Sequence, residues 1–198
     1  MGGRFCRMAS YMGTIHTPRK YLPSPEDIIR INGELLEAAT HGNCTLIRNL
    51  LSQGADLNAK DSKSRSVLAL VCKTPNPDSV KMLLKKGANV NSADCCGWTA
   101  LMHVSTWPPR DSSIEEKKIE IAKSLISEGA DVNARDRKGR TALTYAVMNG
   151  DLELAMILIT AGADINTPDY DDVKPLQHAV SSSFPPMVDL LKKHGATK

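Results

Sequence analysis

The chain has 198 residues, of which 41% are hydrophobic, 4% aromatic and 24% charged, and its formal net charge is +3. This composition is ordinary for a globular protein of one domain, and the charge is too small to indicate nucleic-acid binding by itself. No stretch reaches the roughly 20 apolar residues that a membrane-spanning helix needs. No secretory hydrophobic region follows Met1. We therefore expect a cytoplasmic protein, or a nuclear one if the source is eukaryotic.

Residues 1–23 contain four basic residues and no acidic residue, and they show no helical or strand periodicity. We interpret this segment as a disordered basic tail. Two alternatives are open. A basic start without acids is typical of a mitochondrial presequence, although a clear amphipathic helix is missing. Met1-Gly2 opens a myristoylation signal, but Cys6 occupies the place of the required Ser or Thr.

The helical part of the chain begins at Ser24, because Ser24, Pro25 and two acidic residues form a typical helix start. This helix runs to Gly42, and the next one ends in the pentapeptide Gly54-Ala55-Asp56-Leu57-Asn58. Near-copies of the pentapeptide begin at Gly87, Gly129 and Gly162, with a truncated copy at Gly195. The intervals between the glycines are 33, 42, 33 and 33 residues, which indicates a repeat array with nine extra residues in its third repeat.

Each of these glycines follows an apolar stripe of helical period. A leucine stands four residues before every glycine, at Leu50, Leu83, Leu125, Leu158 and Leu191. Another apolar residue stands seven before it, at Ile47, Val80, Ala122, Ala155 and Val188. Because glycine adopts the left-handed conformation cheaply, each copy is predicted to end a helix at this point.

A polar turn and a further helix start follow each pentapeptide. The most regular copy, Asp136-Arg137-Lys138-Gly139-Arg140-Thr141, predicts a tight turn followed by a threonine helix cap. Ser64 and Asp172 replace the turn glycine in the second and fifth copies. In the third copy, Trp107-Pro108-Pro109 ends the first helix. Ser113-Ile114-Glu115-Glu116 then predicts a capping box that starts a lengthened second helix.

The succession Asp-x-x-Gly-x-Thr-x-Leu, two helices and Gly-Ala-Asp-x-Asn closely resembles the ankyrin repeat, over residues 28–198. The resemblance implies an all-α repeat solenoid of helix–turn–helix units joined by β-hairpin-like turns, with N- and C-terminal capping repeats. The predicted repeat domain is 24–198, with repeats at approximately 24–60, 61–93, 94–135, 136–168 and 169–198.

No catalytic constellation is visible in the sequence. The five histidines fall in different parts of the array, and a phosphate-binding glycine loop, a nucleophile elbow and paired carboxylates are all missing. Cys95-Cys96 with His103 supplies three metal-binding side chains, but a structural zinc site takes four at set spacings. We therefore expect no enzyme activity, no metal site and no cofactor.

The ankyrin resemblance implies a binding surface made of the hairpin tips and the ends of the first helices. The candidate site residues at matching positions are Lys63, Arg65, Trp98, Trp107, Arg137, Lys138, Arg140 and Tyr170. Tryptophan beside arginine is a typical composition for a binding hot spot. We predict a monomeric, non-enzymatic protein-interaction module, serving as adaptor, scaffold or regulatory subunit, whose concave groove binds an acidic protein partner.

Two alternatives stand beside that prediction. The tryptophans are suited to stack on the bases of a phosphate-bearing ligand, such as a nucleotide or short oligonucleotide, while the basic tips bind its phosphates. Alternatively, Trp98 packs against the neighbouring tip, Trp107 packs under Pro108-Pro109, and the basic tips are only a solvated edge.

Overall fold

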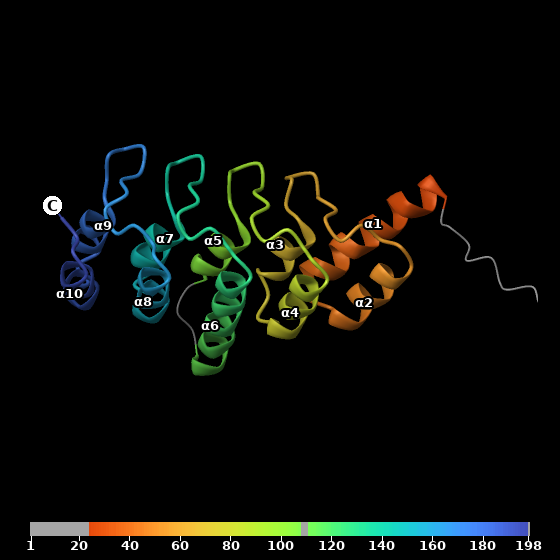
Figure 1. Cartoon of the computed structure of the whole chain (residues 1–198), viewed down its shortest axis with the longest axis horizontal. Helices are drawn as coiled ribbons and strands as arrows, with labels where there is room; N and C mark the ends of the chain where they lie inside the picture. Colours follow the sequence, from red (N-terminus) through yellow and green to blue (C-terminus); the bar gives the residue numbers. More distant parts are fainter. Residues whose placement is uncertain (1–23, 108–110, 198) are drawn as a thin grey trace, which may run out of the picture.

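The structure, a computed structural model, describes residues 24–107 and 111–197, so the predicted tail lies outside the described residues. These residues form ten helices: α1 (Pro25–Thr40), α2 (Cys44–Ser52), α3 (Val67–Val71), α4 (Pro77–Lys85), α5 (Ala100–Ser105), α6 (Ser112–Ser127), α7 (Ala142–Met148), α8 (Leu152–Thr160), α9 (Pro175–Ser181) and α10 (Pro185–Lys193). The helices stand in pairs, one pair per repeat, and the pairs follow one another in a row (Figure 1). The predicted all-α repeat solenoid is confirmed.

The helices form two layers that share one continuous core. The first helices of successive repeats pack together, α1 on α3, α3 on α5, α5 on α7 and α7 on α9, and α4, α6, α8 and α10 form the outer layer. All five stripe leucines are buried. Each repeat therefore contacts chiefly its neighbours, as expected of a solenoid.

The predicted start of α1 is confirmed, and that of α6 is wrong by two residues. Ser24 accepts a hydrogen bond from the backbone of Asp27, and the Asp27 carboxylate accepts one in return. At α6 the capping residue is Asp111, whose Oδ1 accepts from Ile114 N–H at 3.1 Å, so Ser113 lies inside the helix. Aspartate caps a helix as well as serine does, so the helix starts two residues earlier than predicted, which adds about half a turn.

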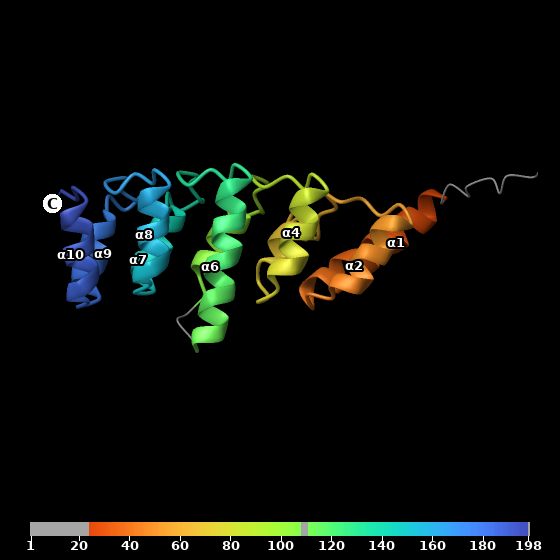
Figure 2. The ribbon, with the colours of Figure 1, turned by 60° about the horizontal axis from the view of Figure 1, so that its bottom comes forward.

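The insertion in the third repeat mainly lengthens α6. This helix has 16 residues, whereas α2, α4, α8 and α10 have nine each. The difference amounts to about two helical turns. As a result α6 extends beyond its neighbours at the end that lies away from the hairpin tips (Figure 2).

The recurring asparagine of the pentapeptide joins one repeat to the next. Asn91 Oδ1 accepts from Asp131 N–H at 2.8 Å, and its Nδ2 donates to Gly129 O at 3.0 Å. Asn133 and Asn166 make the same two contacts one and two repeats further along. The glycine carbonyl and the N–H two residues after it lie just past a helix end and have no partner within the helix. An asparagine side chain recurs at this position because its amide can pair with both groups.

Candidate functional site

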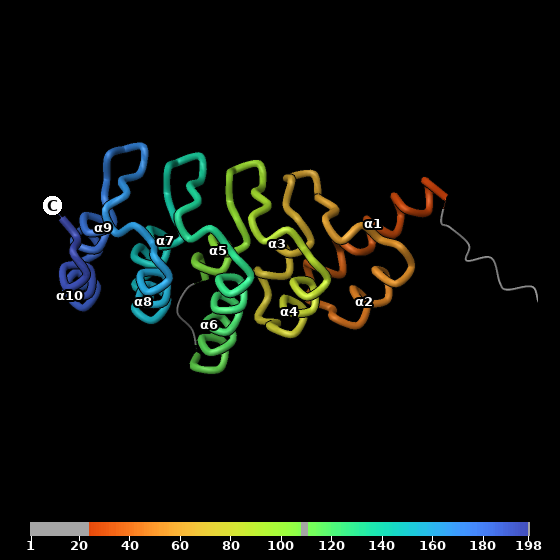
Figure 3. Tube along the Cα trace, in the orientation of Figure 1, coloured from red at the N-terminus to blue at the C-terminus, as the bar shows by residue number. Residues whose placement is uncertain are grey.

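Four hairpin tips project side by side from one edge of the array (Figure 3). They comprise residues 61–65, 94–98, 136–140 and 169–173, and together we call them the tip ridge. Three backbone hydrogen bonds join neighbouring tips, each 2.9 Å long: Cys95 N–H to Lys63 O, Arg137 N–H to Cys96 O and Tyr170 N–H to Lys138 O. The tip ridge is therefore one continuous surface and not four separate loops.

An aspartate organises the turn of every tip. Asp136 Oδ1 accepts from the backbone N–H of Lys138 at 2.8 Å and of Arg140 at 2.9 Å. The same pair of bonds forms at Asp61, Asp94 and Asp169. At the turn position Gly139 has φ +76°, and a Cβ added there would lie 2.7 Å from Tyr170 Cδ1. Glycine thus provides both the turn and the close approach of the next tip.

Ser64 and Asp172 occupy the same turn position without a glycine. Both adopt a φ of +58°, so these two tips keep the geometry of the regular ones. A short polar side chain tolerates this left-handed conformation better than a bulky one does. The hairpins of the second and fifth repeats therefore form as the other two do.

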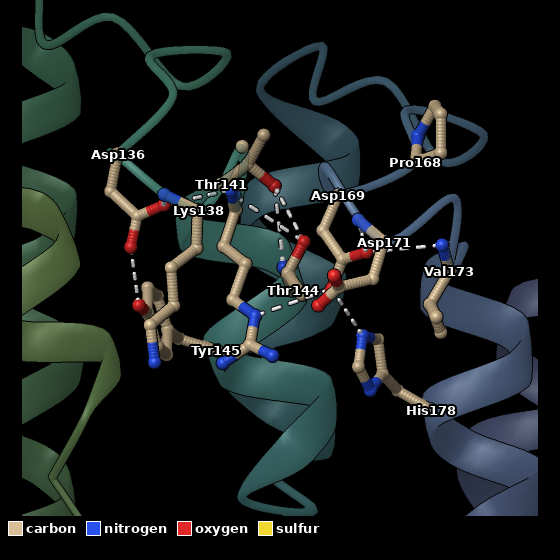
Figure 4. A network of polar contacts seen from close by, with 12 residues as sticks. Asp136, Lys138, Thr141, Thr144, Tyr145, Pro168, Asp169, Asp171, Val173 and His178 are labelled. Carbon is tan, nitrogen blue, oxygen red and sulfur yellow. Dashed lines mark hydrogen bonds and ion pairs between the residues drawn. The ribbon is translucent and has the colours of Figure 1, made fainter.

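Two of the predicted site arginines are held in ion pairs within the protein. Arg65 Nη2 lies 2.6 Å from Asp61 Oδ2. Arg140 Nε lies 3.3 Å from Asp169 Oδ2, an oxygen that also faces His178 Nε2 at 3.2 Å (Figure 4). Burial acts to raise the pKa of Asp169, but its hydrogen bonds, from Val173 N–H first and then from His178 and Arg140, lower that pKa on balance. Both guanidinium groups therefore have a structural role.

Trp98 is likewise held between two repeats. Its ring lies against His103 of its own repeat, with centroids 5.2 Å apart, and against Tyr145 of the next repeat, at 4.9 Å. Its Nε1 donates to Asp136 Oδ2 at 3.1 Å. The side chain is half-buried. This arrangement corresponds to the alternative in which Trp98 packs against the neighbouring tip, and it leaves little open ring surface for stacking on a base.

The residue nine positions after each tip aspartate explains these pairings, although the sequence interpretation did not link the two positions. It is polar in three repeats, where His103, Tyr145 and His178 face their own aspartates. In the second repeat it is Leu70, which is buried, and Arg65 supplies the missing partner of Asp61. The fixed spacing of nine residues could have predicted from the sequence which side chain pairs with each aspartate.

Burial also changes the acidity of two of these groups. It lowers the pKa of His103 to about 4, against an opposing effect of Asp94. It raises the pKa of Tyr145, and the hydrogen bond from the Tyr145 hydroxyl to Asp136, 2.5 Å long, acts in the same direction. Both side chains are therefore neutral near pH 7, as suits groups packed beneath the tips.

The remaining candidates on the tip ridge face the solvent. Lys63, Arg137 and Lys138 are exposed, and Tyr170 exposes 67% of its surface. The guanidinium of Arg135, just before the third of these tips, lies 4.9 Å from the centre of the Tyr170 ring. Trp107 is half-buried and packs against the core; its predicted contact with Pro108 and Pro109 lies outside the described residues. The structure thus leaves three cations and one tyrosine of the predicted set exposed on the tip ridge.

The outer face carries depressions with a different character. One of about 790 Å³ runs along α6 and is lined by glutamates and lysines, among them Glu115, Glu116, Glu120, Lys81 and Lys123. Lys81 and Glu120 form an ion pair of 2.5 Å across it. Charges of both signs face each other here, so this surface does not select an acidic partner in the way that the tip ridge can.

Comparison with known families agrees with this architecture. The sequence model of a family described as ankyrin repeats (3 copies) matches residues 35–108 and 112–198. The matched segments cover most of the chain. Within the described residues, no helix combines the length and the apolar character required to cross a membrane.

Proposed function

The chain belongs to the ankyrin repeat family, and from this premise we propose that it is a non-enzymatic adaptor that binds an acidic protein partner along its tip ridge. Ankyrin repeats are in general protein-interaction modules, and the tip ridge specifies the chemistry of the partner. The surface, and not the fold, indicates which partner is bound, because a repeat fold by itself serves many partners.

One observation carries the proposal: the first and third tips expose cations, while the aspartate that organises each turn is used internally. The exposed acidic residues of the ridge, Asp171 and Asp172, both lie on the fourth tip. Lys63, Arg137 and Lys138 are exposed, and the aspartates of the same two tips, Asp61 and Asp136, accept the turn hydrogen bonds. The backbone bonds between tips fix these cations on one rigid edge. A positive edge of this kind attracts an acidic surface and speeds its association.

Tyr170 supplies the apolar part of the proposed contact. It is large and exposed, and Arg135 holds its ring from one side at 4.9 Å. Aromatic side chains that are already ordered lose little entropy on binding, and they are frequent hot spots. We assign Tyr170, in place of Trp98, the role of anchor because Trp98 already has partners on two sides.

The test is a comparison of two charge-reversal variants in a pull-down from the native lysate, followed by binding kinetics with the recovered partner. The first variant carries Lys63→Glu, Arg137→Glu and Lys138→Glu on the tip ridge. The control carries Lys85→Glu, Lys86→Glu and Lys123→Glu, which are exposed on the outer helices and change the net charge equally.

We expect the tip variant to associate at least about tenfold more slowly and to lose most of the salt dependence of association. The outer-face control should bind nearly as the native protein does. Equal behaviour of the two variants would reject the tip ridge as the binding surface. Binding that is lost only in the control would place the partner on the outer helices.

A further inference from the structure

Two cysteines stand next to each other on the second tip of the ridge, residues 94–98, and both neighbouring tips carry exposed cations. Cys95 and Cys96 are both exposed, and their sulfur atoms lie 3.9 Å apart. A carboxylate oxygen of Asp94 and the two sulfurs all lie within 4.8 Å of one another. The sequence argument against a metal required four protein ligands, but a zinc site with an open coordination position needs only three.

The backbone that carries the two thiols is fixed on both sides. Cys95 N–H donates to Lys63 O, Arg137 N–H donates to Cys96 O, and Gly97 N–H closes the turn on Asp94 O at 3.0 Å. Asp94 Oδ1 accepts from Cys96 N–H at 2.7 Å. The three donor groups are therefore already gathered, so little conformational entropy opposes the binding of an ion.

The distance between the sulfurs suits a metal better than a disulfide. Two thiolates at about 2.3 Å from a tetrahedral zinc ion lie about 3.8 Å apart, close to the separation found here. A disulfide bond needs about 2.0 Å between its sulfurs. Forming one between Cys95 and Cys96 would require the turn to twist and its hydrogen bonds to the adjoining tips to shift.

A buried histidine lies beneath the proposed aspartate ligand, as Tyr145 and His178 lie beneath the aspartates of their own tips. The side chain of His103 is only 7% exposed, and its Nε2 lies 3.4 Å from Asp94 Oδ2. This nitrogen has no well-aligned hydrogen-bond partner among the described residues. Carboxylates that bind metals are commonly oriented by such a neighbour. His103 is therefore placed to position Asp94 and does not itself reach the sulfurs.

We propose that Asp94, Cys95 and Cys96 bind one thiophilic divalent cation of the zinc class, whose fourth coordination position is open to water or to a partner's side chain. Binding displaces the two thiol protons into solvent, so an ion of charge 2+ replaces two protons and the net charge of the tip stays the same. The inference is independent of the proposed function, since steering by the cations of the ridge does not change.

Titration of the untagged full chain with Co²⁺, in a phosphine reductant that keeps the thiols reduced, tests the proposal. Co²⁺ binds at zinc sites, and its coordination by thiolates produces a charge-transfer absorption in the near ultraviolet. We expect this absorption to saturate at one Co²⁺ per chain and to disappear when Zn²⁺ is added, because zinc binds sulfur ligands more tightly.

Two double variants identify the ligands. Cys95→Ser with Cys96→Ser should lose the absorption, while its circular dichroism and melting temperature stay those of the native protein because both side chains are exposed. Cys6→Ser with Cys44→Ser removes as many thiols elsewhere and should keep the absorption. Absence of the band in the native protein, or its survival in the Cys95 and Cys96 variant, would overturn the proposal.

Discussion

Lys118 is the one lysine found fully buried in the described part of the chain. Its Nζ lies 2.5 Å from Glu115 Oε1 and forms a second ion pair with Asp151 Oδ2. Lys118 stands seven residues before the stripe leucine Leu125. In three other repeats the residue at this position caps the second helix: Asn43, Asn76 and Asp151. Because α6 starts earlier than the other second helices, the equivalent position lies inside α6. The long side chain of Lys118 reaches from there to Asp151, the capping residue of α8.

The substitution Lys118→Met should lower the free energy of unfolding by about 3 to 5 kcal/mol, because it leaves Asp151 buried without its counter-charge. Adding Asp151→Asn keeps an acceptable helix cap while removing that charge. The double variant should therefore lose clearly less than the sum of the two single losses. Urea unfolding of the four proteins measures the coupling; strictly additive losses would show that the pair contributes nothing.

At the scale of the element, each outer helix presents one narrow apolar face to the core. In α8, Leu154, Ala155 and Leu158 are buried, whereas Met156 exposes 38% of its surface. The same register runs through the outer helices, with differences at the two terminal repeats. In α2, Leu46 stands at the position of Leu154 but exposes 39% of its surface, and α10 differs as well. There Met187 is fully buried and Val188 only partly, because the last helix packs on one side alone.

Leu158→Ala should cost about 2 to 5 kcal/mol of unfolding free energy, because the cavity forms in the middle of the stack where neither repeat can collapse into it. Met156→Ala, two residues away in α8, should cost less than about 1 kcal/mol. Chemical denaturation of the two variants beside the native protein compares them directly. Similar losses at both positions would contradict the assigned register.

At the scale of the whole molecule, stability is shared between neighbouring repeats. Bonds from Asn91 and Asn133, the tip-to-tip bonds and the ion pair between Lys118 and Asp151 all connect adjacent repeats. In an array of this kind stability is approximately a sum of repeats and their interfaces. Removing repeats from one end should weaken the remainder without abolishing its fold.

The fragment 1–133 should stay helical by circular dichroism and melt at a lower temperature than the full chain. Its tryptophan emission should also shift to longer wavelength, because Trp98 loses Tyr145 and Asp136. The fragment 1–168 keeps both of those partners and should keep the native emission. A wholly unfolded 1–133 fragment would contradict the nearest-neighbour account.

The sequence alone determined the repeat length, the helix pairs, the buried leucines and the basic tips, because each depends on local spacing that recurs within one repeat. Helical period and the glycine stops are read along the chain without knowledge of distant contacts. The same count placed the insertion in the third repeat, although Asp111, and not Ser113, caps the lengthened helix.

Only the tertiary structure decided which candidate side chains are free to bind. Arg65, Trp98 and Arg140 occupy equivalent tip positions, yet the first pairs with its own aspartate and the other two with that of the next repeat. That choice depends on whether the residue nine positions after the aspartate is polar, and on how closely the next tip approaches. Contacts of this kind cross between repeats some 30 to 40 residues apart, so spacing within a single repeat does not reveal them.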